Sequence, residues 1–167
     1  MTKKVSILAL FSAFAIILSY IESFIPVSGI GGAKLGLANF AVIMAMYLLG
    51  NKEALFINII RIFIIGFMFG NLFSICFSIA GAVVSFIAMI LLKYFKRFSM
   101  ISVAVMGGVF HNIGQIIVAA FVVENISVVV YIPILIISGI VTGFIIGILS
   151  NSIYLRGKKH FFVLLDK

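Results

Sequence analysis

The stretch VMGGVFHNIGQIIVAA, residues 105–120, is apolar enough to dissolve in lipid, yet it carries three hydrogen-bonding side chains. Residues spaced i, i+3, i+4 and i+7 share one face of a helix. Such a face cannot contact lipid without leaving donors unsatisfied, so it must point into a helical bundle or a water-filled cavity. The stretch therefore predicts a membrane-spanning helix with one inward polar stripe: Gly108, His111, Asn112, Gln115 and Ala119.

The rest of the chain has the same apolar character. Of its 167 residues, 65% are hydrophobic and 10% are charged, and the mean hydropathy is +1.40. A soluble domain with this composition would have too little polar surface to face water. Charged and Gly- or Pro-rich breaks separate six apolar segments, which predict an all-α integral membrane protein with six transmembrane helices in a single domain, residues 1–167. The segments are 5–24, 37–49, 54–69, 72–92, 100–123 and 130–153.

Lysine and arginine are distributed unevenly along this pattern. With six spans, ten of the twelve basic residues fall on the side that carries both termini, and Lys34 is the one residue on the other side. The positive-inside rule therefore predicts that both termini are cytoplasmic. With five or seven spans, the basic residues would be distributed over both sides of the membrane. The net charge of +8 is thus explained by topology, and the scatter of basic residues over helix ends argues against nucleic-acid binding.

The twelfth basic residue, Arg61, lies inside the third segment, nine residues after Lys52, or roughly 13 Å along a helix. A charge at this depth is costly and needs partners. Asn58 lies three residues earlier, on the same helical face. Two interpretations stay open: Arg61 binds an anionic or carbonyl-bearing ligand, or it pairs with helix-end carbonyls or an internal carboxylate and orders the bundle.

The polar stripe of residues 108–119 has the same two interpretations. Its side chains form hydrogen bonds between helices, or they share a ligand pocket with Arg61 and Asn58. The connection IPVSGIGGAKLGLAN, residues 25–39, adds two candidate ligand-binding side chains, Lys34 and Asn39. Its four glycines and one proline make it irregular and able to approach a ligand closely. We expect it to cover an extracellular pocket; the alternative is a flexible connector.

Several classes of activity are excluded by what the sequence lacks. There is no P-loop motif, so the chain does not bind ATP through one. The four acidic residues lie at or beyond the ends of the predicted helices, which disfavours proton- or sodium-coupled transport and magnesium-dependent chemistry on diphosphates. We therefore expect a binding protein rather than an enzyme, with no catalytic residue, metal site or cofactor of its own. The acidic residues are Glu22, Glu53, Glu124 and Asp166.

Small residues at four-residue spacing occur in the first and last helices. Ala9 and Ala13 form such a pair, and Gly139, Gly143 and Gly147 form such a row. Both patterns allow another helix to approach closely. We expect the glycine row to pack inside the bundle, whereas the alanine pair could pack within it or against a partner protein.

Four stretches carry a resemblance to a known family. They are AKLGLANF (33–40), YLLGNKEALFINIIRI (47–62), SIAGAVVSFIAMILLK (78–93) and VMGGVFHNIGQIIVAA (105–120), in which FHNIGQ is the most distinctive part. The chain resembles the heptaprenyl diphosphate synthase component I group, also called the Gx transporter family. That group is similar to the substrate-binding S components of energy-coupling factor (ECF) transporters.

The resemblance implies a six-helix protein of the bacterial cytoplasmic membrane that binds its ligand near the extracellular side. In S components an alanine-xxx-alanine pair on the first helix contacts a transmembrane coupling subunit, and two partner ATPases use the ATP; Ala9 and Ala13 match that pair. Prenyl synthases carry aspartate-rich motifs, and this chain has none. The family name therefore does not describe an active site in this chain.

Our leading hypothesis is a substrate-capture subunit of an ECF-type importer, with substrate held between the first loop and helices 3, 5 and 6. The resemblance implies an isoprenoid or quinone precursor as its substrate. The alternative is a membrane accessory subunit of polyprenyl diphosphate synthesis, and a third option is a facilitator that needs no partner. The expected ligand-binding residues are Lys34, Asn39, Asn58, Arg61, His111, Asn112 and Gln115.

Overall fold

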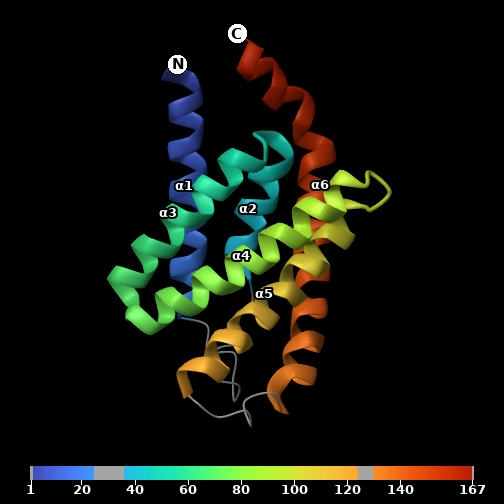
Figure 1. The fold of residues 1–167 in the computed structure, drawn as a ribbon. Coiled ribbons are helices and arrows are strands. Elements are labelled where there is room, and N and C mark those ends of the chain that lie inside the picture. Colours follow the sequence, from blue (N-terminus) through green and yellow to red (C-terminus); the bar gives the residue numbers. More distant parts are fainter. Residues whose placement is uncertain (1, 25–35, 124–129, 167) are drawn as a thin grey trace.

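The computed structural model describes residues 2–24, 36–123 and 130–166. Over these ranges the chain forms six α-helices and no strand (Figure 1). Each predicted apolar segment corresponds to one helix, and five of the helices follow the predicted bounds within three residues. The helices are α1 (Thr2–Ser23), α2 (Leu37–Leu48), α3 (Asn51–Phe69), α4 (Leu72–Tyr94), α5 (Met100–Val123) and α6 (Ile132–Asp166).

The last helix is longer than the sequence pattern predicted. We expected it to end at residue 153, but α6 continues to Asp166. Aromatic contacts accompany the extension: the ring of Tyr154 lies 5.8 Å from that of Tyr47 on α2, and the ring of Phe161 lies 6.2 Å from that of Phe11 on α1. Hydropathy alone marks where a helix leaves the apolar region, and it does not mark where the helix stops.

Four helices in the described part, α1, α4, α5 and α6, are long and apolar enough to cross a membrane. The helix α2 is apolar but shorter. Large apolar side chains remain exposed along the bundle, among them Phe67 on α3 and Phe121 on α5, at 73% and 78% exposure. Such a surface suits lipid and is unsuited to water. The chain is therefore a helical membrane protein, and the six-span topology stays a prediction.

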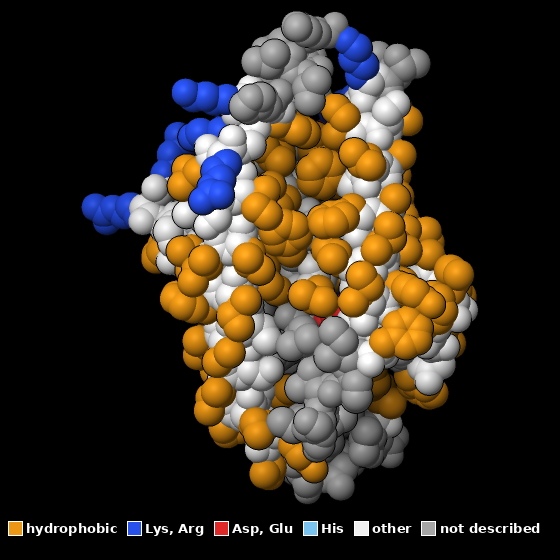
Figure 2. Space-filling model, turned by 180° about the vertical axis from the view of Figure 1, so that it is seen from behind, with side chains coloured by type: hydrophobic (Ala, Val, Ile, Leu, Met, Phe, Trp, Pro, Cys, Tyr) orange, Lys and Arg blue, Asp and Glu red, His pale blue; other side chains and the backbone are white. Residues whose placement is uncertain are grey.

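Both termini lie at one end of the molecule (Figure 1). The last turn of α5 and the first turn of α6 lie at the opposite end. Figure 2 shows apolar side chains over the flank of the bundle, with Lys and Arg side chains gathered towards the end that carries the termini. This distribution is the one that the positive-inside rule requires if that end is cytoplasmic.

The short helix α2 is the centre of the bundle and packs against α1, α3 and α6. Seven of its twelve residues are buried, including Ile43 and Met46. Its two ends are held by opposite charges. The N–H of Gly36 donates to the Glu22 carboxylate at the start of α2, and near its end the Lys93 ammonium donates to the Met46 carbonyl over 2.5 Å. A negative charge at the start of a helix and a positive charge at its end both interact favourably with the helix dipole.

Glycines set the spacing between α4, α5 and α6. A Cβ atom on Gly139 of α6 would lie 2.8 Å from the Val109 nitrogen on α5, and one on Gly143 would lie 2.6 Å from the Val105 Cα. On the other side of α5, a Cβ atom on Gly114 would lie 2.7 Å from the Ala80 carbonyl oxygen of α4. The expectation that the glycine row packs inside the bundle is thus confirmed, and its partner is α5.

Candidate ligand-binding site

Arg61 lies near the middle of α3 and reaches across to α1. Its Nε and Nη2 donate to the Asn58 Oδ1 over 3.2 and 2.6 Å, which the three-residue spacing on one helix allows. Its Nη1 lies 3.4 Å from the hydroxyl oxygen of Ser19, which donates to the Ala15 carbonyl over 2.9 Å. Asn58 and Arg61 thus share a face as predicted and are also hydrogen-bonded, and Ser19 is a partner from a second helix.

The acidic residue of this site is Glu22, which the sequence pattern had placed only at a helix end. It is the penultimate residue of α1 and is 8% exposed, because α2 begins beside it. Its carboxylate accepts the Gly36 N–H and lines both polar cavities described below. Glu22 thus lies at a helix end as predicted, but it is buried there, and burial at a helix end leaves no periodic signal in a sequence.

The polar stripe of α5 meets Arg61 at a very small cavity. Four of the predicted side chains line it, Asn39, Arg61, His111 and Asn112, together with Glu22, Gly36, Gly108 and Thr142. Its volume of about 20 Å³ leaves room for about one water molecule. The structure therefore brings these residues together as a packed polar core, and a role in holding a ligand stays a prediction.

Contacts between helices account for part of the stripe. The Asn112 Nδ2 donates to the Leu135 carbonyl of α6 over 2.7 Å and is buried. The His111 imidazole packs on α4, since a Cβ atom on Gly81 would lie 2.9 Å from its Nδ1. Gln115 is half-buried and lines neither polar cavity. Asn112 thus forms a hydrogen bond between helices, as one of the two interpretations predicted. The remaining predicted residue, Lys34, lies outside the described residues.

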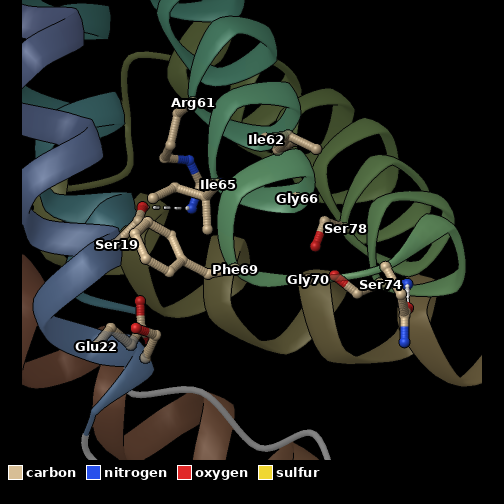
Figure 3. A pocket seen from close by; sticks show the side chains of 12 residues that line it. Ser19, Glu22, Arg61, Ile62, Ile65, Gly66, Phe69, Gly70, Ser74 and Ser78 are labelled. Carbon is tan, nitrogen blue, oxygen red and sulfur yellow. Dashed lines mark hydrogen bonds between the residues drawn. The ribbon is translucent and has the colours of Figure 1, made fainter.

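A larger cavity lies on the other side of Arg61, between α1, α3 and α4 (Figure 3). Its volume is about 370 Å³, within the range of small-molecule pockets. Ser19, Glu22 and Ser23 line it from α1, and Arg61 and Glu22 are shared with the small cavity. We had expected the ligand space between helices 3, 5 and 6. Helix α3 lines this cavity as expected, together with α1 and α4. Most of the first loop lies outside the described residues, so the predicted space beneath it stays a prediction.

The α4 wall of this cavity was missed from the sequence. Asn71, Ser74 and Ser78 line it, at the spacing i, i+3, i+7 that places residues on one helical face. The Asn71 Oδ1 also accepts the Ser74 N–H over 2.8 Å and caps the helix. The same periodicity that identified the α5 stripe would have found this one. It was overlooked because serine is weakly polar and common in membrane helices.

Ala9 and Ala13, the expected coupling pair, lie on an exposed face of α1. Leu10, Phe14 and Ile17 are exposed beside them, at 69%, 41% and 54%. The pair is therefore not used for packing within the described part of the bundle. Of the two interpretations that the sequence left open, the outward-facing one matches the structure, and a partner protein on this face stays a prediction.

Comparison with known proteins identifies one family. The family model for heptaprenyl diphosphate synthase component I matches residues 11–153. Neither the curated proteins nor the solved structures contain a match. The match covers α2 to α5 completely, including the polar stripe, Arg61 and the serine face of α4. The chain belongs to the heptaprenyl diphosphate synthase component I family.

Proposed function

We propose that this protein is the membrane-embedded substrate-binding subunit of an ECF-type importer, which captures a small molecule from outside the cell. The observation that carries the proposal is the cavity of about 370 Å³ between α1, α3 and α4. A charged, hydroxyl-lined space within an apolar bundle is costly unless it is functional. A protein that only anchored a partner would have no need of it.

The exposed alanine pair on α1 supports the second half of the proposal. Ala9 and Ala13 lie one helical turn apart and let another helix approach the α1 backbone closely. We infer that this face contacts a transmembrane coupling subunit, and that two ATPases bound to that subunit use the ATP. In this arrangement the chain itself needs no cofactor and works in the cytoplasmic membrane of a bacterium.

Replacement of Ala9 and Ala13 by tryptophan tests the coupling face. We expect the double variant to lose co-purification with the coupling subunit and ATPases while it keeps its ligand. The matched control is tryptophan at Val141 and Ile145, which have the same spacing and are 52% and 53% exposed on α6. Unchanged complex formation by the alanine double variant would refute this assignment of the face.

Arg61 tests the binding role. We expect Arg61→Ala to reduce ligand binding by tenfold or more, because a lost charge-assisted contact is worth about 1.5–3 kcal/mol. The midpoint of thermal unfolding should fall much less, since Asn58 and Ser19 can bind water in the cavity. Native mass spectrometry of ligand that co-purifies, with unfolding measured in parallel, gives both quantities. Parallel losses of binding and stability would mean that Arg61 is structural.

A second candidate function is favoured by the family description itself. The chain would be a membrane accessory subunit for polyprenyl diphosphate synthesis, and the polar residues would order the bundle or bind a diphosphate. Affinity purification of the tagged full chain from its native membrane separates the two. Recovery of a soluble prenyl synthase without ATPases would favour the accessory role, and recovery of ATPases would favour import.

A further inference from the structure

The cavity between α1, α3 and α4 has three chemically distinct walls. Arg61 and Glu22 provide the charges at one end (Figure 3). The α4 wall presents hydroxyl and amide groups, those of Ser74, Ser78 and Asn71. The α3 wall is apolar and consists mainly of Ile62, Ile65 and Phe69. A molecule that fills this space needs a charged group at one end, a hydrogen-bonding edge and an apolar side.

Glu22 attracts the positive charge of Arg61, but the two side chains form no ion pair. Its three hydrogen bonds go to the neutral groups of Asn58 and Ser19. Within the described ranges no carboxylate lies at ion-pair distance from it, although Glu22 lines the same cavity. A guanidinium has five N–H donors in a planar fork that suits a carboxylate. A charged hydrogen-bond partner stabilises a buried cation more than neutral partners do, and the cavity has room for one.

The charge count limits what that partner can be. Among the described residues Arg61 is the one basic side chain that lines the cavity, and Glu22 adds a negative charge at the same end. A phosphate monoester carries about −1.5 to −2 at pH 7, and a diphosphate carries more. Such a group would be repelled by Glu22 and only partly balanced by Arg61. Arg61 and Glu22 together are neutral, so any anion adds negative charge at this end. A single carboxylate can pair with the Arg61 fork and, of these anions, is repelled least by Glu22.

We propose that the cavity binds a small monocarboxylate with an apolar body and a hydroxyl or carbonyl group, which the serine face of α4 recognises. This inference rests on the proposed binding function and names the class of ligand for it. The carboxylate pairs with the Arg61 fork. The hydrogen-bonding edge faces Ser74 and Ser78, and the apolar body packs on Ile65 and Phe69.

Simple anions test the charge preference. The purified full chain is heated in acetate, in chloride and in pyrophosphate at equal ionic strength. At acetate ten times above its dissociation constant, we expect the midpoint of unfolding to rise by roughly 3–6 °C over chloride, with a smaller rise in pyrophosphate. Arg61→Gln should abolish the acetate effect and Arg61→Lys should retain part of it. Exposed Arg156→Gln is the matched control and should behave as wild type.

A second pair of probes tests the serine face. We expect 3-hydroxybutyrate to bind about two- to tenfold more tightly than butyrate, the worth of one hydrogen bond. Ser78→Ala should remove that preference and leave the affinity for butyrate unchanged. Exposed Ser152→Ala on α6 should leave the preference intact.

Each outcome decides the inference. It is overturned if acetate gives no stabilisation beyond chloride, if pyrophosphate stabilises more than acetate, or if Arg61→Gln responds like wild type. It is also overturned if Ser78→Ala keeps the preference for the hydroxyl. None of these results depends on the coupling subunit or the ATPases. A failure here would therefore leave the import role to be decided by co-purification, and loss of co-purification would leave the ligand class standing.

Discussion

The contact between Gly139 of α6 and Gly108 of α5 sets how closely these two helices approach. A Cβ atom on Gly139 would lie 2.8 Å from the Val109 nitrogen and 2.9 Å from the Gly108 carbonyl carbon and oxygen. All three are backbone atoms and cannot turn aside as a side chain can. The substitution Gly139→Ala must therefore push α5 and α6 apart.

The cost of this separation follows from what the contact contains. Overpacking by one methyl group typically costs about 1–3 kcal/mol. For a chain of this size that corresponds to a fall of roughly 2–12 °C in the midpoint of thermal unfolding. Gly108 also lines the small cavity with Arg61 and His111, so the same substitution should widen the polar core of the bundle.

Gly157 supplies the matched control on the same helix. A Cβ atom there would meet nothing within 4 Å. Alanine is a better helix former than glycine by about 1 kcal/mol, so Gly157→Ala should leave the midpoint unchanged or raise it by up to about 4 °C. Thermal unfolding of both variants in the same detergent measures the difference. Equal midpoints for Gly139→Ala and Gly157→Ala would refute the argument that backbone contact holds α5 against α6.

Three further substitutions remove side-chain hydrogen bonds, and thermal unfolding measures the effect of each. Lys93→Met removes the donor to the Met46 carbonyl and to the Asn51 Oδ1, 2.8 Å away, and should cost about 1–3 kcal/mol; an unchanged midpoint would mean that α2 does not need this charge. Asn112→Leu leaves the buried Leu135 carbonyl without its donor and should also cost about 1–3 kcal/mol; an unchanged midpoint would mean that α6 shifts and the carbonyl finds another donor. Ser85→Ala removes the 2.8 Å bond to the Gly107 carbonyl and should cost about 1 kcal/mol; a stabilised variant would contradict this.

Helix positions were predictable because lipid imposes a simple rule. Each apolar run between charged or Gly- and Pro-rich breaks became one helix, and Gly50, with φ of 124°, lies at a predicted break where the backbone needs glycine. The shared face of Arg61 and Asn58 was also predictable from their three-residue spacing. The extension of α6 was not, because its last turns lie beyond the apolar run and depend on aromatic contacts with α1 and α2.

The candidate site was likewise predictable from the sequence only in part. Sequence periodicity by itself determined that Arg61, His111 and Asn112 face inward, because an unsatisfied donor cannot face lipid. Only the tertiary structure decided that Glu22 joins them and that a cavity of ligand size lies between α1, α3 and α4. Helix spacing and crossing depend on contacts between distant glycines, such as Gly108 with Gly139. Within the described residues such contacts bring α4, α5 and α6 close together, and no local pattern in the chain encodes which helices will meet.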